Sequence, residues 1–177
     1  RLNECAFGRL DLSHTSPGWR NVLQYGATGL RNRATAALAT ARDEEAAHFF
    51  RAVAIVAEAM RTYILRLAAE AGRLDARRVT GTLQALAQRA PASLHEALQW
   101  AFLFNQVQEI EGELVRSQGV FDQLFFPYYD ADLRSGRLTR DQAKELIYCF
   151  FDKFAAQHFG AGNNFCFGGR DAAGNDL

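Results

Sequence analysis

The chain has 177 residues, of which 49% are apolar and 23% charged, and this is enough for one globular unit with a buried core. The composition excludes a disordered or collagen-like protein. Twenty basic and twenty acidic side chains balance, so the positive surplus that nucleic acid or an anionic membrane attracts is missing. No stretch approaches the roughly 18 consecutive apolar residues of a membrane helix, and residues 1–5 do not start a signal peptide. The sequence therefore predicts no nucleic-acid partner, no membrane association and a cytoplasmic location.

The cysteines and histidines show no metal-binding pattern. Cys5, Cys149 and Cys166 form neither a disulfide framework nor a CxxC clip, which fits a reducing compartment. The histidines form no HExxH motif, so we predict no metal site; they are His14, His48, His95 and His158. Because Cys166 lies between two phenylalanines in a predicted strand, we expect a buried structural thiol rather than a nucleophile.

Capping signals predict the first two helices. Ser16 as N-cap and Pro17 at the first helical position predict a helix that runs to about Thr40. A second helix should begin at Asp43, where carboxylates in the first turn favour the positive end of the helix dipole. Gly72 should end this helix in a left-handed cap.

The central part of the chain predicts two more helices. Asp75 should cap a third helix that Pro91 terminates. Ser93 and Glu96 form an S-x-x-E capping box, which predicts the start of a fourth helix. The apolar residues of this helix leave little exposed face, so it should be central; they are Leu98, Trp100, Leu103, Phe104, Val107, Ile110 and Leu114.

The last third of the chain changes from helix to strand. Gly136 should end a short helical piece, and Thr139 with Gln142 forms a second capping box that opens another helix. Short strands are predicted at residues 10–13 and 164–168. The second has no obvious partner, and an isolated strand cannot satisfy its backbone groups, so we expect the chain to be part of something larger.

Three features have competing interpretations. The glycines at 160–162 and 168–169 suggest a phosphate loop, but the order of helix, glycines and strand favours a helix terminator and a close backbone approach. His14 either reaches a ligand from the end of a strand or is a solvated loop residue. Four aspartates either form paired carboxylates or, as we favour, serve turns through local hydrogen bonds; they are Asp122, Asp130, Asp132 and Asp141.

Several ordered motifs together resemble the glycyl radical enzymes of the pyruvate formate-lyase type. They lie at residues 17–26 with 29–30, 90–99, 117–123, 127–129 and 132–139 with Ala143, Glu145 and Leu146. The resemblance covers almost the whole chain, from about His14 to Asp176. It implies that residues 1–177 are a partial domain of an α/β barrel of ten strands. This segment should be mostly helical with two short strands, and should supply one early barrel strand, outer helices and the strand around residues 164–168.

The resemblance also implies a radical mechanism whose key residues lie elsewhere. In the family, a glycyl radical generates a cysteine thiyl radical that attacks the substrate. This sequence contains neither the cysteine loop nor the glycyl radical loop, so we assign it no catalytic residue, no bound cofactor and no activity alone. The parent protein would be an anaerobic lyase, dehydratase, decarboxylase or formate C-acetyltransferase-like transferase, with its glycyl radical installed by a radical SAM activating enzyme.

Substrate contacts can be carried over at three positions. His14 matches a family position that reaches the substrate, and Leu114 with Val115 matches a pocket pair just before the S-x-G motif. Where an arginine is replaced by histidine, the bidentate clamp for a carboxylate is lost, and an apolar pair cannot recognise hydroxyl groups. Together with Val120, which stands where the family usually has arginine, these changes favour a more apolar substrate over pyruvate or a small diol.

Two interpretations of function stay open from the sequence. The chain is a segment of a glycyl radical enzyme, partnered by the rest of the barrel, the activating enzyme and a small organic substrate, and a homodimer is compatible with this. Alternatively, it is a stand-alone helical interaction module. A segment should leave Phe165, Phe167 and the helix of Trp100 uncovered, whereas an evolved module would cover them.

Overall fold

The computed structural model describes residues 16–110, 116–156, 163–171 and 173–176. The elements in these ranges are α1 (Trp19–Leu38), α2 (Glu44–Arg73), α3 (Arg77–Gln88), α4 (Leu94–Ile110), β1 (Arg116–Val120), α5 (Phe121–Arg134), α6 (Arg140–Ala156) and β2 (Asn163–Cys166). The expectation of a mostly helical segment with two short strands is confirmed, although one strand lies where none was predicted.

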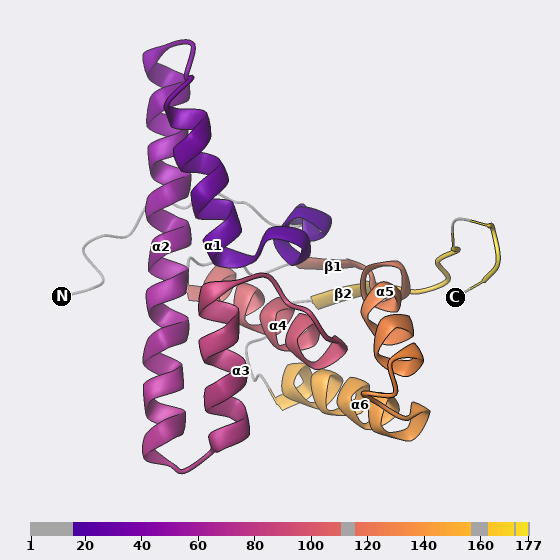
Figure 1. Ribbon diagram of the computed structural model, residues 1–177. Helices are drawn as coiled ribbons and strands as arrows, with labels where there is room; N and C mark the ends of the chain where they lie inside the picture. The colour runs from indigo at the N-terminus through magenta and orange to yellow at the C-terminus, as the bar shows by residue number, and fades with distance from the viewer. Residues whose placement is uncertain (1–15, 111–115, 157–162, 172, 177) are drawn as a thin grey trace.

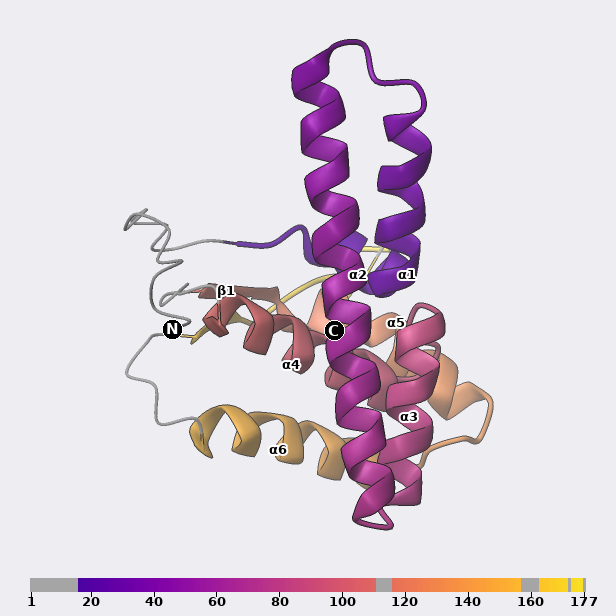
Figure 2. The same cartoon turned by 90° about the vertical axis from the view of Figure 1, so that its left-hand side faces the viewer.

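The helices form layers around α4 (Figure 1). The long α2 packs against α1 along one half and against α3 along the other, so one end of the α1–α2 pair projects from the body of the molecule (Figures 1 and 2). α4 contacts helices on both sides, namely α1, α2 and α3 on one side and α5 and α6 on the other. The predicted central position of α4 is therefore confirmed.

Local capping accounts for where several helices begin. The Asp43 carboxylate accepts a 2.8 Å hydrogen bond from the Ala46 N–H, as expected of an N-cap. Thr139 and Gln142 form the complete reciprocal box, with bonds of 2.9 and 3.2 Å. The remaining capping box differs in one detail, because its glutamate bonds to the N–H of Ala92 and not to that of the N-cap serine.

The predicted boundary between α2 and α3 is wrong in two respects. Gly72 is not a left-handed cap but lies inside α2, and the residue with positive φ is Asp75, at 54°. Asp75 does not cap α3, whose N-cap residue is Ala76 without a side-chain bond; its carboxylate instead pairs with Arg77. The turn closes through backbone bonds, including Ala76 N–H to the Ala71 carbonyl at 2.9 Å, so no side-chain cap is required.

A kink at Gly26 lets α1 approach the turn between α3 and α4. Gly26 has φ 59° and ψ −178°, and a Cβ placed there would lie 3.0 Å from the Ala90 Cα. Only glycine combines this backbone conformation with such close contact. The kink separates a short first turn of α1 from the longer part that pairs with α2 (Figure 1).

The strand around residues 164–168 has a partner that the sequence did not reveal. β1 and β2 pair in parallel, with Arg116 opposite Asn163 and Ser117 opposite Asn164, and α5 and α6 form the crossover between them. The ladder is irregular between Ser117 and Val120. The predicted strand at residues 10–13 lies outside the described residues.

The core consists of the inner face of α4 and an aromatic cluster between α5, α6 and β2. Trp100 is fully buried and donates a 2.7 Å bond to the Val22 carbonyl. The cluster joins rings from all three elements; these are Phe121, Phe125, Phe150, Phe151, Phe154 and Phe165.

Four expectations about exposure can be compared with this core. Phe167 is 63% exposed, as expected of a segment, but the helix of Trp100 is not uncovered as predicted, because Leu98, Trp100 and Leu103 on it are buried. Ile110 is 70% exposed and not part of the core. Cys166 is exposed and not buried, because it faces away from the aromatic cluster that its neighbour Phe165 enters.

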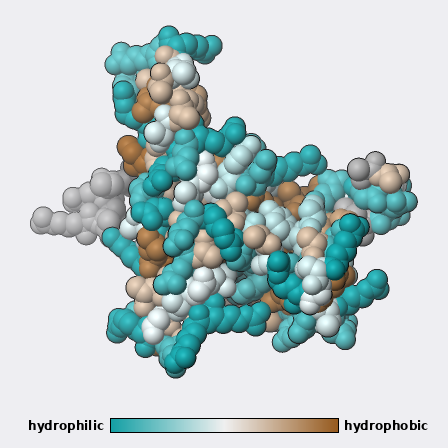
Figure 3. Space-filling model, in the orientation of Figure 1, coloured by the Kyte–Doolittle hydropathy of each residue, from teal (hydrophilic) through white to brown (hydrophobic). Residues whose placement is uncertain are grey.

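The surface in Figure 3 is mostly hydrophilic, with separate apolar patches over α2 and near α5. None of the described helices has the length and hydropathy needed to cross a bilayer. Within the same residues, no three His, Cys, Asp or Glu side chains gather as a metal site would require.

Candidate functional site

The candidate site is centred on the parallel strand pair. Because Arg116 pairs with Asn163, the first residues of β1 and β2 lie side by side at the same end of the sheet. The predicted substrate residues Leu114 and Val115 precede β1. Together with His14, they lie outside the described residues, so their roles stay predictions.

A cluster of amide side chains joins the strands to α4. The Gln118 Nε2 donates to the Asn105 Oδ1 at 2.7 Å and to the Asn163 Oδ1 at 3.2 Å. Asn105 is fully buried on α4, and Gln118 is nearly so on β1. One side chain therefore links three elements, α4, β1 and β2, inside the protein.

A buried ion pair lies beside this amide cluster. Arg116, the first residue of β1, is completely buried, and its Nη2 donates a 2.7 Å bond to the Glu109 Oε1 on α4. Burying a guanidinium is costly unless its donors are satisfied. Arg116 and Gln118 are two residues apart on the strand and both bond to α4, so they share one face of β1.

Several buried polar atoms in and beside these contacts have no hydrogen-bond partner among the described residues. They are Arg116 Nε and Nη1, Asn105 Nδ2 and Gln108 Oε1. Buried polar atoms without partners are rare in folded proteins, and each costs about 1–3 kcal/mol. These four atoms belong to three side chains: Asn105 and Gln108 lie about one turn apart on α4, and Arg116 is the first residue of β1. We refer to Asn105, Glu109, Arg116, Gln118 and Asn163 as the strand-end polar cluster.

The first turn of α1 also binds β1, through a backbone carbonyl group of the strand. The Trp19 Nε1 donates a 2.8 Å bond to the Ser117 carbonyl. Gly119 has φ 72°, and a Cβ there would lie 2.9 Å from the Leu124 Cδ1 and 3.1 Å from the Trp19 Cδ1. The glycine of the S-Q-G stretch thus permits the close packing of strand, indole and α5.

The two glycines after β2 bind a carboxylate of the protein itself. The N–H groups of Gly168 and Gly169 both donate to the Asp122 Oδ2 at 2.7 Å. Burial acts to raise the pKa of Asp122, but the N–H groups of Gly169, Gly168 and Gln123 outweigh it and hold the pKa below its ordinary value. A close backbone approach therefore accounts for this glycine pair, in agreement with the interpretation favoured from the sequence over a phosphate loop.

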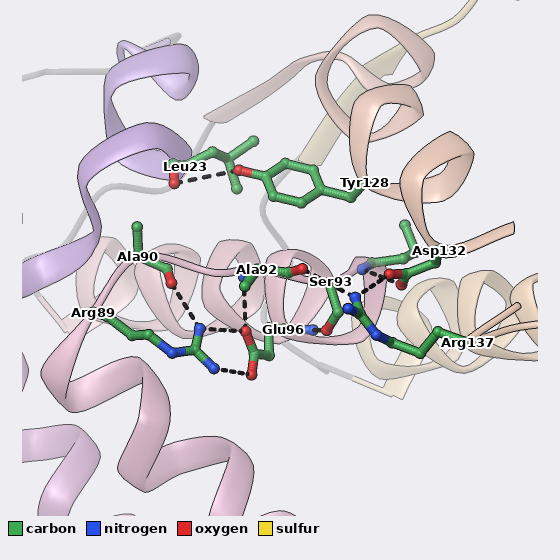
Figure 4. A network of polar contacts seen from close by, with 10 residues as sticks. Leu23, Arg89, Ala90, Ala92, Ser93, Glu96, Tyr128, Asp132 and Arg137 are labelled. Atoms are coloured by element: carbon green, nitrogen blue, oxygen red, sulfur yellow. Dashed lines mark hydrogen bonds and ion pairs between the residues drawn. The ribbon is translucent and has the colours of Figure 1, made fainter. Parts of the chain in front are cut away.

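The aspartates that suggested paired carboxylates bind other groups, but not through the local turn bonds that we favoured: Asp122 binds the glycines after β2, and Asp130 pairs with Arg134 within α5. Asp132 is buried and accepts from the Leu94 N–H at 2.8 Å and from Arg137, whose guanidinium also donates to the Ala92 carbonyl (Figure 4). Arg89 and Glu96 brace the same α3–α4 turn with two hydrogen bonds of 2.7 and 2.8 Å. This network fixes the start of α4, and with it the position of the strand-end polar cluster.

Sequence reasoning did not single out any member of the strand-end polar cluster. One signal was available, since Asn105, Gln108 and Glu109 follow one another at helical spacing in the second half of a helix with a largely apolar core face. Polar residues on the buried face of a central helix indicate buried partners. Which partners they have depends on the strand pairing, and that could not be read locally.

The family model described as pyruvate formate lyase-like matches residues 9–177. The chain belongs to the pyruvate formate lyase-like family. It is 33% identical over 117 residues to isethionate sulfite-lyase from Nitratidesulfovibrio vulgaris, covering 58% of this chain and 14% of that protein. It is also 27% identical over 112 residues to the 4-hydroxyphenylacetate decarboxylase glycyl radical subunit of Clostridioides difficile, covering 56% and 12%.

Solved structures agree with this assignment. A structure described for 1,2-propanediol dehydration in Roseburia inulinivorans superposes with a TM-score of 0.79 at 27% identity, covering 93% of this chain and 23% of that one. The chain thus corresponds to less than a quarter of the length of the relatives described. The expectation that it is a segment of a glycyl radical enzyme barrel is confirmed.

Proposed function

We propose that the parent protein is a radical lyase, dehydratase or decarboxylase that cleaves or forms a C–C or C–X bond in a small organic substrate. The observation that carries this is the parallel pairing of β1 with β2, which brings two family-matched segments to one end of a sheet. Relatives named as a sulfite-lyase and a decarboxylase support the reaction class. A formate C-acetyltransferase reaction is less well supported, because His14 replaces the carboxylate-binding arginine.

In this proposal the segment holds barrel strands in position and supplies no residue that takes part in the radical chemistry. Its described residues hold β1 and β2 against α4 and α1, and its sequence contains neither the cysteine loop nor the glycyl radical loop. The glycyl radical belongs to the remainder of the parent barrel and is installed by a radical SAM activating enzyme. The setting would be the anaerobic cytoplasm, with the barrel remainder, the activating enzyme and a second copy of the parent as partners.

In the same proposal, three residues determine which substrate is bound. His14, Leu114 and Val115 would line the pocket, and the apolar pair would favour a substrate with an apolar group beside the bond that breaks. A hydroxyl or carboxylate buried against an apolar pair loses its hydrogen bonds to water and gains none from these side chains. We therefore expect small diols and pyruvate to be poor substrates.

The experiment uses the full-length polypeptide that contains this segment. It is activated anaerobically with its radical SAM enzyme, the glycyl radical is measured by electron paramagnetic resonance, and turnover is screened against pyruvate, 1,2-propanediol, a sulfonate and an arylacetate. A radical with turnover of one of the last two supports the proposal. Absence of a radical after activation would exclude the enzyme class, and a preference for pyruvate or the diol would exclude the pocket assignment.

A further inference from the structure

We propose that two copies of this chain associate through the outer face of α2, which pairs with the same face of the second copy as an antiparallel helix pair. The proposed function includes a second copy as a partner, and this inference identifies the surface that binds it. It does not depend on the radical chemistry. Its basis is an exposed apolar stripe on α2 that has an acidic side chain at one end and a basic side chain at the other.

The stripe consists of five exposed apolar residues that follow one another at helical spacing. They are Phe49, Ala52, Ile55, Val56 and Ala59, and we call this set the α2 stripe. Phe49 is 62% exposed, Ile55 67% and Val56 54%. Steps of three and four residues place the set on one side of α2, over about 15 Å of helix. Exposed apolar residues that form one continuous patch, and are not scattered singly, mark interaction sites.

The core of the segment does not use the α2 stripe. The helix buries a different face, which includes Ala57, Met60 and Ile64. Ala57 and Met60 each follow a stripe residue by one position, which is a rotation of about 100° around the helix. Figure 1 shows α2 along one edge of the molecule, with α1 and α3 on its inner side. The stripe is therefore a second apolar face, and no described element covers it.

Side-chain size favours an antiparallel second copy as the occupant. Residues 49, 52, 56 and 59 have the three- and four-residue spacing of a coiled-coil seam, and they alternate between large and small. In an antiparallel pair, Phe49 lies opposite Ala59 of the second copy, and Val56 lies opposite Ala52. Each large side chain then fills the space beside a small one, whereas a parallel pair would place Phe49 against Phe49. Ile55 lies beside the two-fold axis, where it meets Ile55 of the second copy.

Charges at the two ends of the α2 stripe select the same orientation. Glu45 and Arg66 are both exposed and are 21 residues, or three heptads, apart, so they lie on the same side of the helix. Among the described residues, the ion pairs of α2 join other side chains. An antiparallel pair brings Glu45 beside Arg66 of the second copy, and the two-fold symmetry repeats this contact at the other end. A parallel pair would bring like charges together, which opposes association.

The test measures association of the full-length polypeptide by sedimentation equilibrium, with circular dichroism to check that each variant is folded. Ala59 and Ala69 form a matched pair, because both are exposed alanines of α2 and only Ala59 belongs to the stripe. Ala59→Glu places a carboxylate against Phe49 of the second copy, so the Kd of the dimer should rise about tenfold or more. Ala69→Glu should leave the Kd unchanged.

A charge exchange tests the orientation of the two helices. Glu45→Arg and Arg66→Glu should each raise the Kd about threefold to tenfold, because both symmetric contacts become repulsive. The double variant with both substitutions restores the two contacts in reversed sign, and its Kd should return toward the wild-type value. This recovery is expected only where each copy offers one end of its helix to the opposite end of the other.

Three results would overturn the inference. They are a wild-type polypeptide that is monomeric at micromolar concentration, a dimer whose Kd is unchanged by Ala59→Glu, and a double charge variant that binds no more tightly than the single variants. The first would assign the α2 stripe to the remainder of the parent or to another protein, and the second would place the dimer interface elsewhere. Because sedimentation needs no radical, a polypeptide that dimerises through α2 but forms no glycyl radical would exclude the proposed function and support this inference.

Discussion

The indole Nε1 of Trp19 and the carbonyl oxygen of Ser117 form a 2.8 Å hydrogen bond across 98 residues of sequence. The bond connects the first turn of α1 to a backbone carbonyl in β1. The Gln118 side chain bonds β1 to Asn105 of α4, so two helices hold the strand.

Replacing this indole with a smaller aromatic ring should lower stability mainly through the lost hydrogen bond to β1. Trp19→Phe keeps an aromatic ring but leaves the Ser117 carbonyl without its donor, so we expect a loss of about 1–2 kcal/mol in the free energy of unfolding. Urea unfolding of the chain, followed by circular dichroism, measures it. Tyr148→Phe removes a polar group from an exposed ring and should change little. Equal effects of the two variants would contradict the role of the bond.

Two aspartates on α5, two residues apart, should differ strongly in their contribution. Asp132 is buried and bonds to the Leu94 N–H and to Arg137, whereas Asp130 forms a surface pair with Arg134. Asp132→Asn should cost about 2 kcal/mol, because the Arg137 guanidinium then faces an amide donor. Asp130→Asn should cost less than about 0.5 kcal/mol. Thermal unfolding of both variants tests the contrast, and a similar shift in Tm for both would argue against the network in Figure 4.

Two glycine-to-alanine substitutions should have opposite signs. Gly119 has positive φ, and its missing Cβ would collide with Leu124 and Trp19, so Gly119→Ala should destabilise by about 1–3 kcal/mol. Gly81 lies inside α3, and a Cβ there has nothing within 4 Å, so Gly81→Ala should stabilise by about 0.5–1 kcal/mol. Urea midpoints of the two variants decide the signs, and stabilisation by Gly119→Ala would refute the tight packing at β1.

The pairing of α1 with α2 should depend on acid pH through Glu58. Hydrogen bonds from Arg61 and Arg31 lower the pKa of Glu58 from 4.5 to about 2. A carboxylate with a depressed pKa in the folded state stabilises that state above the unfolded pKa, and the contribution is lost as pH falls through the folded pKa. Glu58→Gln should therefore lower stability at pH 7, and the difference from wild type should shrink between about pH 4.5 and 2.

The control for this pH dependence is Glu70, which pairs only with Arg73 on the same helix. Urea midpoints at pH 7, 5, 4 and 3 should converge for wild type and Glu58→Gln, and Glu70→Gln should follow wild type throughout. A gap between wild type and Glu58→Gln that stays constant with pH would show that the arginine pairs do not stabilise the hairpin.

Local chemistry made most of the helices predictable. The caps at Asp43, Ser93 and Thr139 act within four residues, so the sequence alone contains both partners of each bond. The predicted end of α2 was wrong because it relied on a local signal alone. Gly72 looks like a terminator locally, but backbone bonds around Leu74 and Ala76 close the turn one residue later.

β1 and its polar cluster could not be predicted in this way. Ser117, Gln118 and Gly119 have little intrinsic preference for a strand, and they form one because β2, Trp19 and α4 offer partners. The resemblance, which rested on the order of several motifs, identified the family correctly. It could not indicate Gln118, because an amide that bonds to two distant side chains has no signature in a single stretch of sequence.

The parallel arrangement of β1 and β2 also constrains the order in which the chain can fold during synthesis. Gln118 and Asn163 are 45 residues apart, and α5 and α6 must both be made before β2 exists. Until then the nascent helices α1 to α4 can pack, but β1 lacks its partner β2 and the Gln118 amide lacks one acceptor. A ribosome that pauses within α6 would therefore expose the edge of β1 that pairs with β2 to other nascent chains, until residue 166 leaves the exit tunnel.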